Sequence, residues 1–185
     1  MGFVFRAIGW LVVIVVVVVA ALAVLSFVGS PKASCADGAV ATSRAAEDSF
    51  NSKWTSFDTT LRQGGAATVT LTEEELTSRG AQYLLATNVP AKNLQVHLCP
   101  GQGLGQAAMS MELLGRALDV VATGHLQLDT GNARIVVDSV EIGMVPGPVA
   151  ALAANTILSA ANIQVPSGIR EVTTTSTAAT LKGQR

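Results

Sequence analysis

The hydrophobic pattern of the chain begins with an uninterrupted apolar run. Residues 7–28, AIGWLVVIVVVVVAALAVLSFV, contain no charged side chain. As a helix this run would be roughly 33 Å long, which is enough to cross the hydrocarbon core of a bilayer. We therefore predict a transmembrane helix from Ala7 to Val28, preceded by a short head at 1–6 and followed by a linker at 29–37.

A cleaved signal peptide is the alternative interpretation of this run. The apolar core of a signal peptide is normally shorter and ends in a small-x-small site. Here the small residues of VGS are followed by Pro31, and Lys32 stands where a lipoprotein signal before Cys35 needs an aliphatic residue. A retained anchor is favoured.

The orientation of this anchor is a separate question. The charge bias between Arg6 and Lys32 is slight, but the short head and the large following domain favour a cytoplasmic N-terminus and an extracytoplasmic domain at the cell membrane.

The next segment has the period of an amphipathic helix, from about 38 to 64. Its apolar stripe, with residues three or four positions apart, consists of Ala46, Phe50, Trp54, Phe57 and Leu61. The sequence QGG then ends the helix. An aromatic stripe at this spacing is typical of a helix packed on a core, whereas an exposed stripe of Phe50, Trp54 and Phe57 would be a docking surface for a partner.

A short strand and a second helix follow in the sequence ATVTLTEEELTSRGAQYLLA, at 67–86. Thr72 and Glu75 have the spacing of a capping box, and three glutamates occupy the first turn, where the helix dipole favours negative charge. We do not predict a metal site at these glutamates, because adjacent residues of a helix point in different directions.

Beyond Pro90 the hydrophobic period changes to two. Alternating segments lie at about 94–98, 109–113, 118–128 and 133–143. The links between them are too short for parallel crossovers, so we predict four antiparallel strands. A further helix with an apolar stripe is predicted from about 146 to 163. The threonine-rich sequence at 169–183 is predicted to form two short strands or one bent hairpin.

The triplet Asp129-Thr130-Gly131 joins the last two strands of this series and matches the catalytic triplet of aspartic proteases. The register that keeps the apolar residues on one face pairs Leu128 with Ala133, Leu126 with Ile135, Gly124 with Val137, Gln127 with Arg134 and Thr123 with Asp138. Asp, Gly and Asn also favour a tight turn. A protease would need a second carboxylate, and such enzymes have Ala or Ser where Asn132 stands. We therefore predict that Asp129 is a hairpin corner, with a dimeric aspartic protease as the minor alternative.

Composition and charge argue against several other kinds of chemistry. The formal net charge is −1, so no basic face suggests a nucleic-acid partner. GQGLG at 101–105 lacks the spacing of a dinucleotide loop, and no G-x-S-x-G elbow nominates a nucleophile. We therefore expect no enzyme, no cofactor and no metal. His97 and His125 lie on strand patterns and are expected to face solvent or to be hydrogen-bonded.

The two cysteines, Cys35 and Cys99, allow two interpretations. They fit an oxidising exterior, where they would form one disulfide, or they are small buried hydrophobic residues. Neither has a second cysteine or a histidine at the spacing of a metal ligand.

The order of these elements is helix, strand, helix, four antiparallel strands, helix and terminal strands. With VTLTEEELTSRGAQYLL leading into LQVHL, then HLQLDTGNARIVVDSVEIG and MVPGPVAALAANTIL, the chain resembles the tubular lipid-binding (TULIP) superfamily. It is most similar to small bacterial single-pass members of the YpmS and LmeA kind. The likeness covers about 67–183. It implies an α+β fold at 65–185, in which a strongly curved antiparallel sheet wraps around helices as a half barrel and leaves an apolar groove.

The residues are compatible with such a groove, although an ordinary packed core would also explain them. Groove candidates are Leu76, Tyr83, Leu118, Val120, Leu126, Leu128, Leu152 and Ile157. A groove lined by small aliphatic side chains suits flexible acyl chains.

The leading hypothesis is a membrane-anchored extracytoplasmic module that binds membrane lipids, carrying or presenting them. The rival hypothesis is a non-enzymatic accessory subunit that docks on a membrane complex through its aromatic helix.

Overall fold

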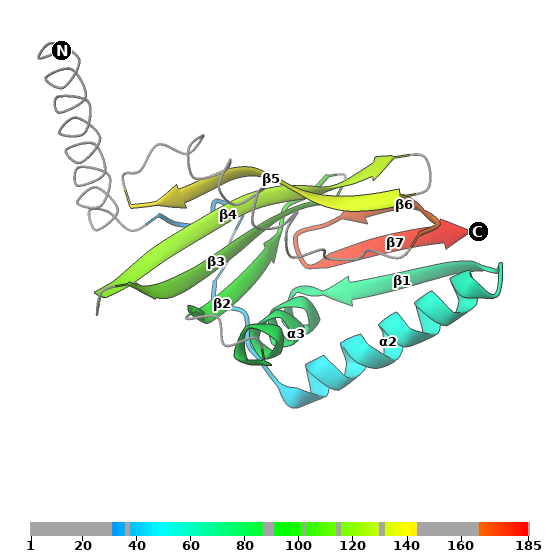
Figure 1. Cartoon of the computed structure of the whole chain (residues 1–185), viewed down its shortest axis with the longest axis horizontal. Coiled ribbons are helices and arrows are strands. Elements are labelled where there is room, and N and C mark those ends of the chain that lie inside the picture. The colour runs from blue at the N-terminus through cyan, green and yellow to red at the C-terminus, as the bar shows by residue number, and fades with distance from the viewer. Residues whose placement is uncertain are drawn as a thin grey trace, which may run out of the picture.

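The computed structural model describes residues 31–35, 38–86, 91–101, 103–113, 116–129, 132–143 and 167–184. Its elements (Figure 1) are α2 (Arg44–Arg62), β1 (Ala66–Thr72), α3 (Glu73–Ala86), β2 (Ala91–Leu98), β3 (Leu104–Leu113), β4 (Arg116–Asp129), β5 (Asn132–Ile142), β6 (Ile169–Thr174) and β7 (Ala178–Gln184). Every pairing among these strands is antiparallel, which confirms the prediction of an antiparallel α+β fold.

Two predicted elements lie outside the described residues. They are the membrane span at 7–28 and the helix at 146–163, which contains the groove candidates Leu152 and Ile157. Of the helices in the described part, neither α2 nor α3 combines the length and the apolar character that crossing a bilayer requires.

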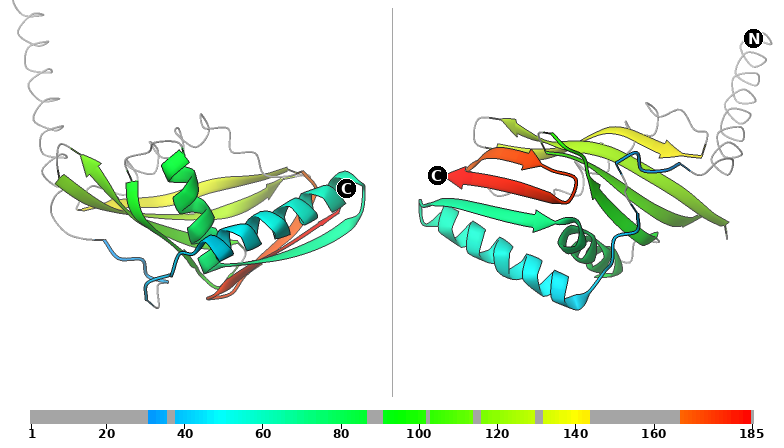
Figure 2. Two further views of the ribbon diagram at one scale, coloured as in Figure 1. Left: turned by 90° about the horizontal axis from the view of Figure 1, so that it is seen from below. Right: turned by 180° about the vertical axis from the view of Figure 1, so that it is seen from behind.

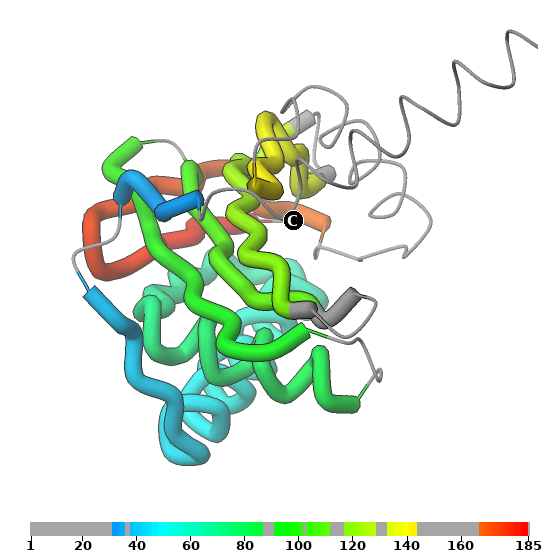
Figure 3. The backbone as a smooth tube through the Cα atoms, turned by 90° about the vertical axis from the view of Figure 1, so that its left-hand side faces the viewer, coloured from blue at the N-terminus to red at the C-terminus, as the bar shows by residue number. Residues whose placement is uncertain are grey.

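The strands form two sheets, one with the order β1-β7-β6 and one with the order β2-β3-β4-β5. Neither sheet is strongly curled (Figure 1, Figure 3), so the prediction of one strongly curved sheet wrapped around helices was wrong for the described part of the chain. The strands divide into two sheets because of a long-range strand pairing. β1 precedes α3 in the chain but pairs with β7, with Ala66 opposite Gln184 and Thr72 opposite Ala178. Local periodicity carries no information about such a partner.

Helix α2 packs on the three-stranded sheet and forms the larger core with it (Figure 2). The buried residues of this core are Phe57, Leu61, Val69, Leu71, Leu98, Ile169, Val172, Ala179 and Leu181. Phe50 and Trp54 are partly buried against the same cluster, and their rings stack with centroids 5.7 Å apart. The aromatic stripe therefore packs against the larger core, with Phe57 buried and Phe50 and Trp54 partly buried.

Helix α3 covers the open edge of β2, an edge strand of the four-stranded sheet. The Val96 N–H donates to Thr77 Oγ1 at 3.0 Å, and the Leu98 N–H donates to Glu73 Oε1 at 2.6 Å. Side chains of the helix thus take the hydrogen bonds that a further strand would make. Gly80 permits this close approach, because a Cβ there would lie 2.6 Å from Leu94 Cδ2.

Helix α2 begins at Arg44, later than predicted. Ser43 is its N-cap, with Oγ accepting from the Ala46 N–H at 3.1 Å. The preceding residues form an extended segment across the four-stranded sheet (Figure 2), here called the strap and consisting of residues 31–35 and 38–43.

Hydrogen bonds and one disulfide hold the strap on β2 and β3. The Cys35 N–H donates to Gln106 Oε1 at 3.0 Å, Gln106 Nε2 donates to Ser34 Oγ at 2.9 Å, and the Val40 N–H donates to Gln95 Oε1. Cys35 is bonded to Cys99, directly after β2, with the Cα atoms 5.4 Å apart. Of the two interpretations of the cysteines, the structure has the disulfide.

The hairpin of β4 and β5 has the predicted register near its turn. Gly124 faces Val137 and Leu128 faces Ala133, and the ladder continues to Asp129 and Asn132, which confirms the hairpin. Farther along, Thr123 faces Ser139, so the predicted pairing of Thr123 with Asp138 was wrong. Asp138 is an extra residue that forms a bulge in β5.

The bulge depends on the absence of a side chain at Gly124. A Cβ at this position would lie 2.5 Å from the carbonyl oxygen of Val136. The backbones of β4 and β5 therefore approach each other at the bulge more closely than any other residue type would allow.

Candidate functional site

The long strands β3, β4 and β5 share one apolar face. Its buried cluster is Val120, Val137 and Val140, with Met109, Met111, Ala122 and Ile142 packed against it. The register explains this grouping, because Met109 faces Val120 and Met111 faces Leu118 across β3 and β4. Side chains directly opposite each other in a ladder lie on the same side of a sheet.

Toward the β4–β5 turn, the same face becomes accessible to solvent. Leu126 faces Ile135, and Leu128 lies two residues farther along β4. Leu128 is 37 % exposed and Ile135 is 46 % exposed. The apolar face is therefore buried at Leu118 and Val120 and open at Leu128 and Ile135.

The structure divides the groove candidates among several places. Leu118, Val120, Leu126 and Leu128 share the β4 side of the apolar face, as the alternation predicted. Leu76 packs against the larger core, which Leu126 also touches. Tyr83 lies half-exposed on α3, 48 % accessible. Leu76 is thus a core residue rather than part of the open end of the face.

Depressions with volumes of about 610, 560 and 420 Å³ lie among the described residues. The first lies between α2 and β1, the second between the start of α2 and α3, and the third where the strap, α3, β2 and the β6–β7 turn meet. None of these three is lined by a groove candidate.

The two histidines have different surroundings. His125 Nδ1 lies 2.8 Å from Asp138 Oδ2, on the polar side of β4 and β5, as expected of a hydrogen-bonded residue. His97, on β2, is 4 % exposed and lines the third depression. His97 is therefore buried rather than solvent-facing, because the strap covers its side of the sheet.

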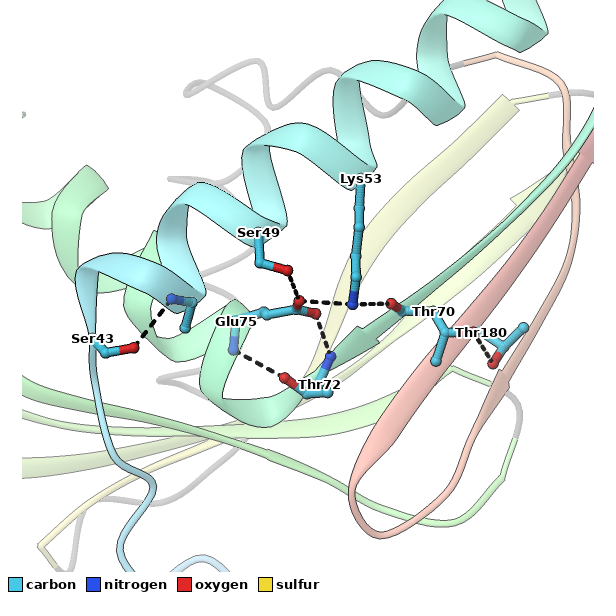
Figure 4. Close-up of polar contacts among 8 residues, drawn as sticks. Ser43, Ser49, Lys53, Thr70, Thr72, Glu75 and Thr180 are labelled. Atoms are coloured by element: carbon cyan, nitrogen blue, oxygen red, sulfur yellow. Dashed lines mark hydrogen bonds and ion pairs between the residues drawn. The ribbon is translucent and has the colours of Figure 1, made fainter.

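Glu75 joins α2, β1 and α3 (Figure 4). The predicted capping box is confirmed, with the Glu75 N–H donating to Thr72 Oγ1 at 3.2 Å and the Thr72 N–H donating to Glu75 Oε2 at 2.9 Å. From α2, Ser49 Oγ donates to Glu75 Oε1 at 2.6 Å, and Lys53 Nζ lies 2.7 Å from the same oxygen. Lys53 also donates to the Thr70 carbonyl at 3.0 Å.

This arrangement fixes the charge of Glu75. Burial alone would raise the pKa of its carboxyl, but hydrogen bonds from Lys53, Ser49 and the Thr72 backbone, with the Lys53 charge, outweigh burial. The pKa is lowered below its ordinary value of 4.5. The charged carboxylate of Glu75 on α3 therefore connects this helix to α2 and β1 through hydrogen bonds and an ion pair.

No protein-family model, curated protein or solved structure shows a significant match to this chain.

Proposed function

We propose that the chain is a membrane-anchored extracytoplasmic lipid-binding module without a catalytic role. The observation that carries this proposal is the apolar face of β3–β5, which remains open at Leu128 and Ile135. Exposed apolar surface of this kind, bordered by polar residues, is typical of interaction sites. Its occupant in the proposal is the acyl chain of a membrane lipid.

The chemistry of the face suits a flexible apolar guest. Met109 and Met111 on β3 have unbranched side chains that adapt to irregular shapes. Each CH₂ group of an acyl chain that leaves water contributes about 0.8 kcal/mol. The resemblance to the tubular lipid-binding superfamily belongs to the same proposal.

An extracytoplasmic location is supported by the disulfide between Cys35 and Cys99. Disulfides persist in oxidising compartments and are rare in the cytosol. Cys35 follows the proposed span at 7–28 by only a few residues, so the proposed anchor leads directly into the strap. The domain would then be held close to the membrane from which it takes its lipid.

Native mass spectrometry of the full chain, extracted in mild detergent, tests the proposal together with lipid extraction. We expect lipid adducts on the wild type and an affinity about tenfold lower after Leu128→Gln with Ile135→Gln, because both changes place an amide on the open apolar surface. The matched control is Leu85→Gln on α3, also an exposed leucine. An empty wild-type protein, or equal loss in the control, contradicts the proposal.

The two rival hypotheses lack comparable support. A subunit that docks through Phe50, Trp54 and Phe57 would need these side chains at the surface, whereas Phe57 is buried in the larger core and the other two are partly buried against it. For the protease, Asp129 ends β4 and pairs with Asn132 in the hairpin ladder, as a turn residue would.

A further inference from the structure

Few non-covalent contacts hold the strap on the four-stranded sheet. Among the described residues, three hydrogen bonds join it to β2 and β3. The Cys35 N–H and Ser34 Oγ both bond to the side chain of Gln106, and the Val40 N–H donates to the side chain of Gln95. No described residue of the strap is buried, and none belongs to either apolar core. The strap therefore lacks the apolar contacts that hold the helices in place.

These hydrogen bonds do not offset the entropy that is lost when the strap becomes ordered. Fixing the backbone of one residue costs about as much free energy as one hydrogen bond contributes on balance. The part of the strap before the N-cap of α2, at 31–35 and 38–42, has ten described residues for three such bonds. Segments with few buried apolar contacts are the first to open in a folded protein. The covalent bond between Cys35 and Cys99 is therefore what keeps the strap on the sheet.

The strap is fixed independently at its other end, where α2 begins. The Ser43 N–H donates to Ser78 Oγ of α3 at 3.1 Å, and Ser43 Oγ donates to Glu74 Oε1 at 2.8 Å. Helix α2 itself packs in the larger core. Loss of the disulfide would therefore free the strap as far as Ser43 and leave the helices and both sheets in place.

We propose that the disulfide between Cys35 and Cys99 is a redox-sensitive switch that determines whether the strap lies on the sheet. The reductant is a dithiol. Its thiolate attacks the sulfur of Cys35, which is half-buried, and displaces the thiolate of Cys99, which is 3 % exposed. The second thiol of the reductant then attacks the mixed disulfide and releases Cys35. Two electrons and two protons pass to the two cysteines, and the reductant becomes a disulfide.

Release of the strap uncovers the polar side of β2 and β3. His97 is 4 % exposed and lines the third depression together with strap residues Gly38, Ala39 and Val40. Gln106, which is 8 % exposed, lies under the two strap residues that bond to it. Both polar side chains are therefore expected to meet solvent when the strap leaves, and His97 provides a chemical measure of its position.

A longer connection to the membrane is the functional consequence, and this part of the inference rests on the anchor proposed at 7–28. With the disulfide intact, the domain is attached at Cys35, seven residues after the proposed span. Seven extended residues reach about 24 Å, whereas the fifteen residues that lead to Ser43 reach about 50 Å. Reduction would thus allow the domain to move about twice as far from the bilayer.

Hydrogen exchange of the full chain in nanodiscs tests the switch. The backbone amides of the strap are compared before and after reduction with dithiothreitol, and peptides from β3 and β4 report on the rest of the fold. We expect exchange at Cys35 and Val40 to become faster by about tenfold or more, with β3 and β4 unchanged. Protection of the strap that survives reduction overturns the proposal. Loss of protection in β3 and β4 as well also overturns it, because the disulfide would then support the whole fold.

Histidine modification gives a second measurement that needs no reductant. Diethyl pyrocarbonate reacts with accessible imidazoles, and the chain contains two histidines. The side chain of His125 is 33 % exposed, so it serves as the internal reference. We expect His97 to be protected in the oxidised wild type and to react in the double variant Cys35→Ser, Cys99→Ser, with equal reaction of His125 in both. A protected His97 in the double variant contradicts the proposal.

The matched control for this measurement is Ser34→Ala. It removes one of the three hydrogen bonds of the strap and keeps the disulfide. We expect His97 to stay protected in this variant. If Ser34→Ala exposes His97 as much as the double cysteine variant does, the hydrogen bonds rather than the disulfide determine the position of the strap, and the proposal is overturned.

The change in reach is measured separately, by energy transfer from a dye at the C-terminus to acceptor lipids in the nanodisc. We expect transfer to fall when the wild type is reduced and to be unaffected by dithiothreitol in the double cysteine variant. Strap release without a change in transfer supports the switch and contradicts the proposed anchor. Transfer that falls equally in the double variant contradicts the switch, because that variant has no disulfide to reduce.

Discussion

At the residue scale, Glu75 shows how one buried carboxylate links local and tertiary structure. Its capping box with Thr72 spans three residues and follows directly from the sequence pattern. Its bonds to Ser49 and Lys53 come from α2, and their formation depends on how α2 packs against α3. The first set of contacts was predictable because it is local, and the second was not.

The lowered pKa of Glu75 makes stability depend on pH. A carboxyl with a lower pKa in the folded state stabilises the protein above its unfolded pKa, and this contribution is lost as pH falls through the folded value. We expect the free energy of unfolding to fall in the acid range below the ordinary value of 4.5 and to fall less steeply in Glu75→Gln. Urea unfolding of both proteins across this range measures the difference. Equal slopes would show that Glu75 has no such role.

At the element scale, the sequence predicted the strands well and their partners poorly. The alternation along β4 placed Leu118, Val120, Leu126 and Leu128 on one face, as found. The bulge in β5 was missed, although the apolar positions change from 135 and 137 to 140 and 142, a shift of parity that signals an extra residue. The pairing of β1 with β7 and the position of α3 on the edge of β2 are long-range events without a local signal.

The edge of β2 provides a test of the role of α3. Thr77 is 0 % exposed, and its Oγ1 accepts the Val96 N–H at 3.0 Å. Thr77→Val keeps the shape and removes the acceptor, leaving the part-buried Val96 N–H unpaired. We expect a loss of about 1–3 kcal/mol in the free energy of unfolding, measured with urea. Thr59→Val, at an exposed position of α2, is the control and is expected to change stability little. Equal effects at both positions would contradict the edge assignment.

The strap provides a second test at this scale. The disulfide closes a loop with a sequence separation of 64 between Cys35 and Cys99. Replacing both cysteines by serine, or reducing the wild type, is expected to lower the free energy of unfolding by about 2–4 kcal/mol, because the unfolded chain regains freedom. Urea unfolding of the oxidised and reduced protein measures this. If reduction destabilises the double serine variant as much as the wild type, the effect does not come from this bond.

At the scale of the whole molecule, the apolar face and the third depression differ in how far the sequence could reveal them. The apolar face follows from alternation within single strands, so its β4 residues were predictable, but its open end at Ile135 depends on what covers each strand. The third depression is formed by the strap, α3, β2 and the β6–β7 turn. Neither His97 nor Glu74 carries a motif, so only the packing of these segments reveals their proximity.

The central claim is that lipid binds to the open apolar face, and photocrosslinking tests it most directly. The full chain in nanodiscs would be irradiated with a phospholipid whose acyl chain carries a photoreactive group, and the crosslinked peptides identified by mass spectrometry. We expect adducts within β4 and β5, near Leu128 and Ile135, that decrease when unlabelled lipid competes. Adducts confined to the proposed anchor at 7–28, or spread without preference over α2 and α3, would contradict the claim.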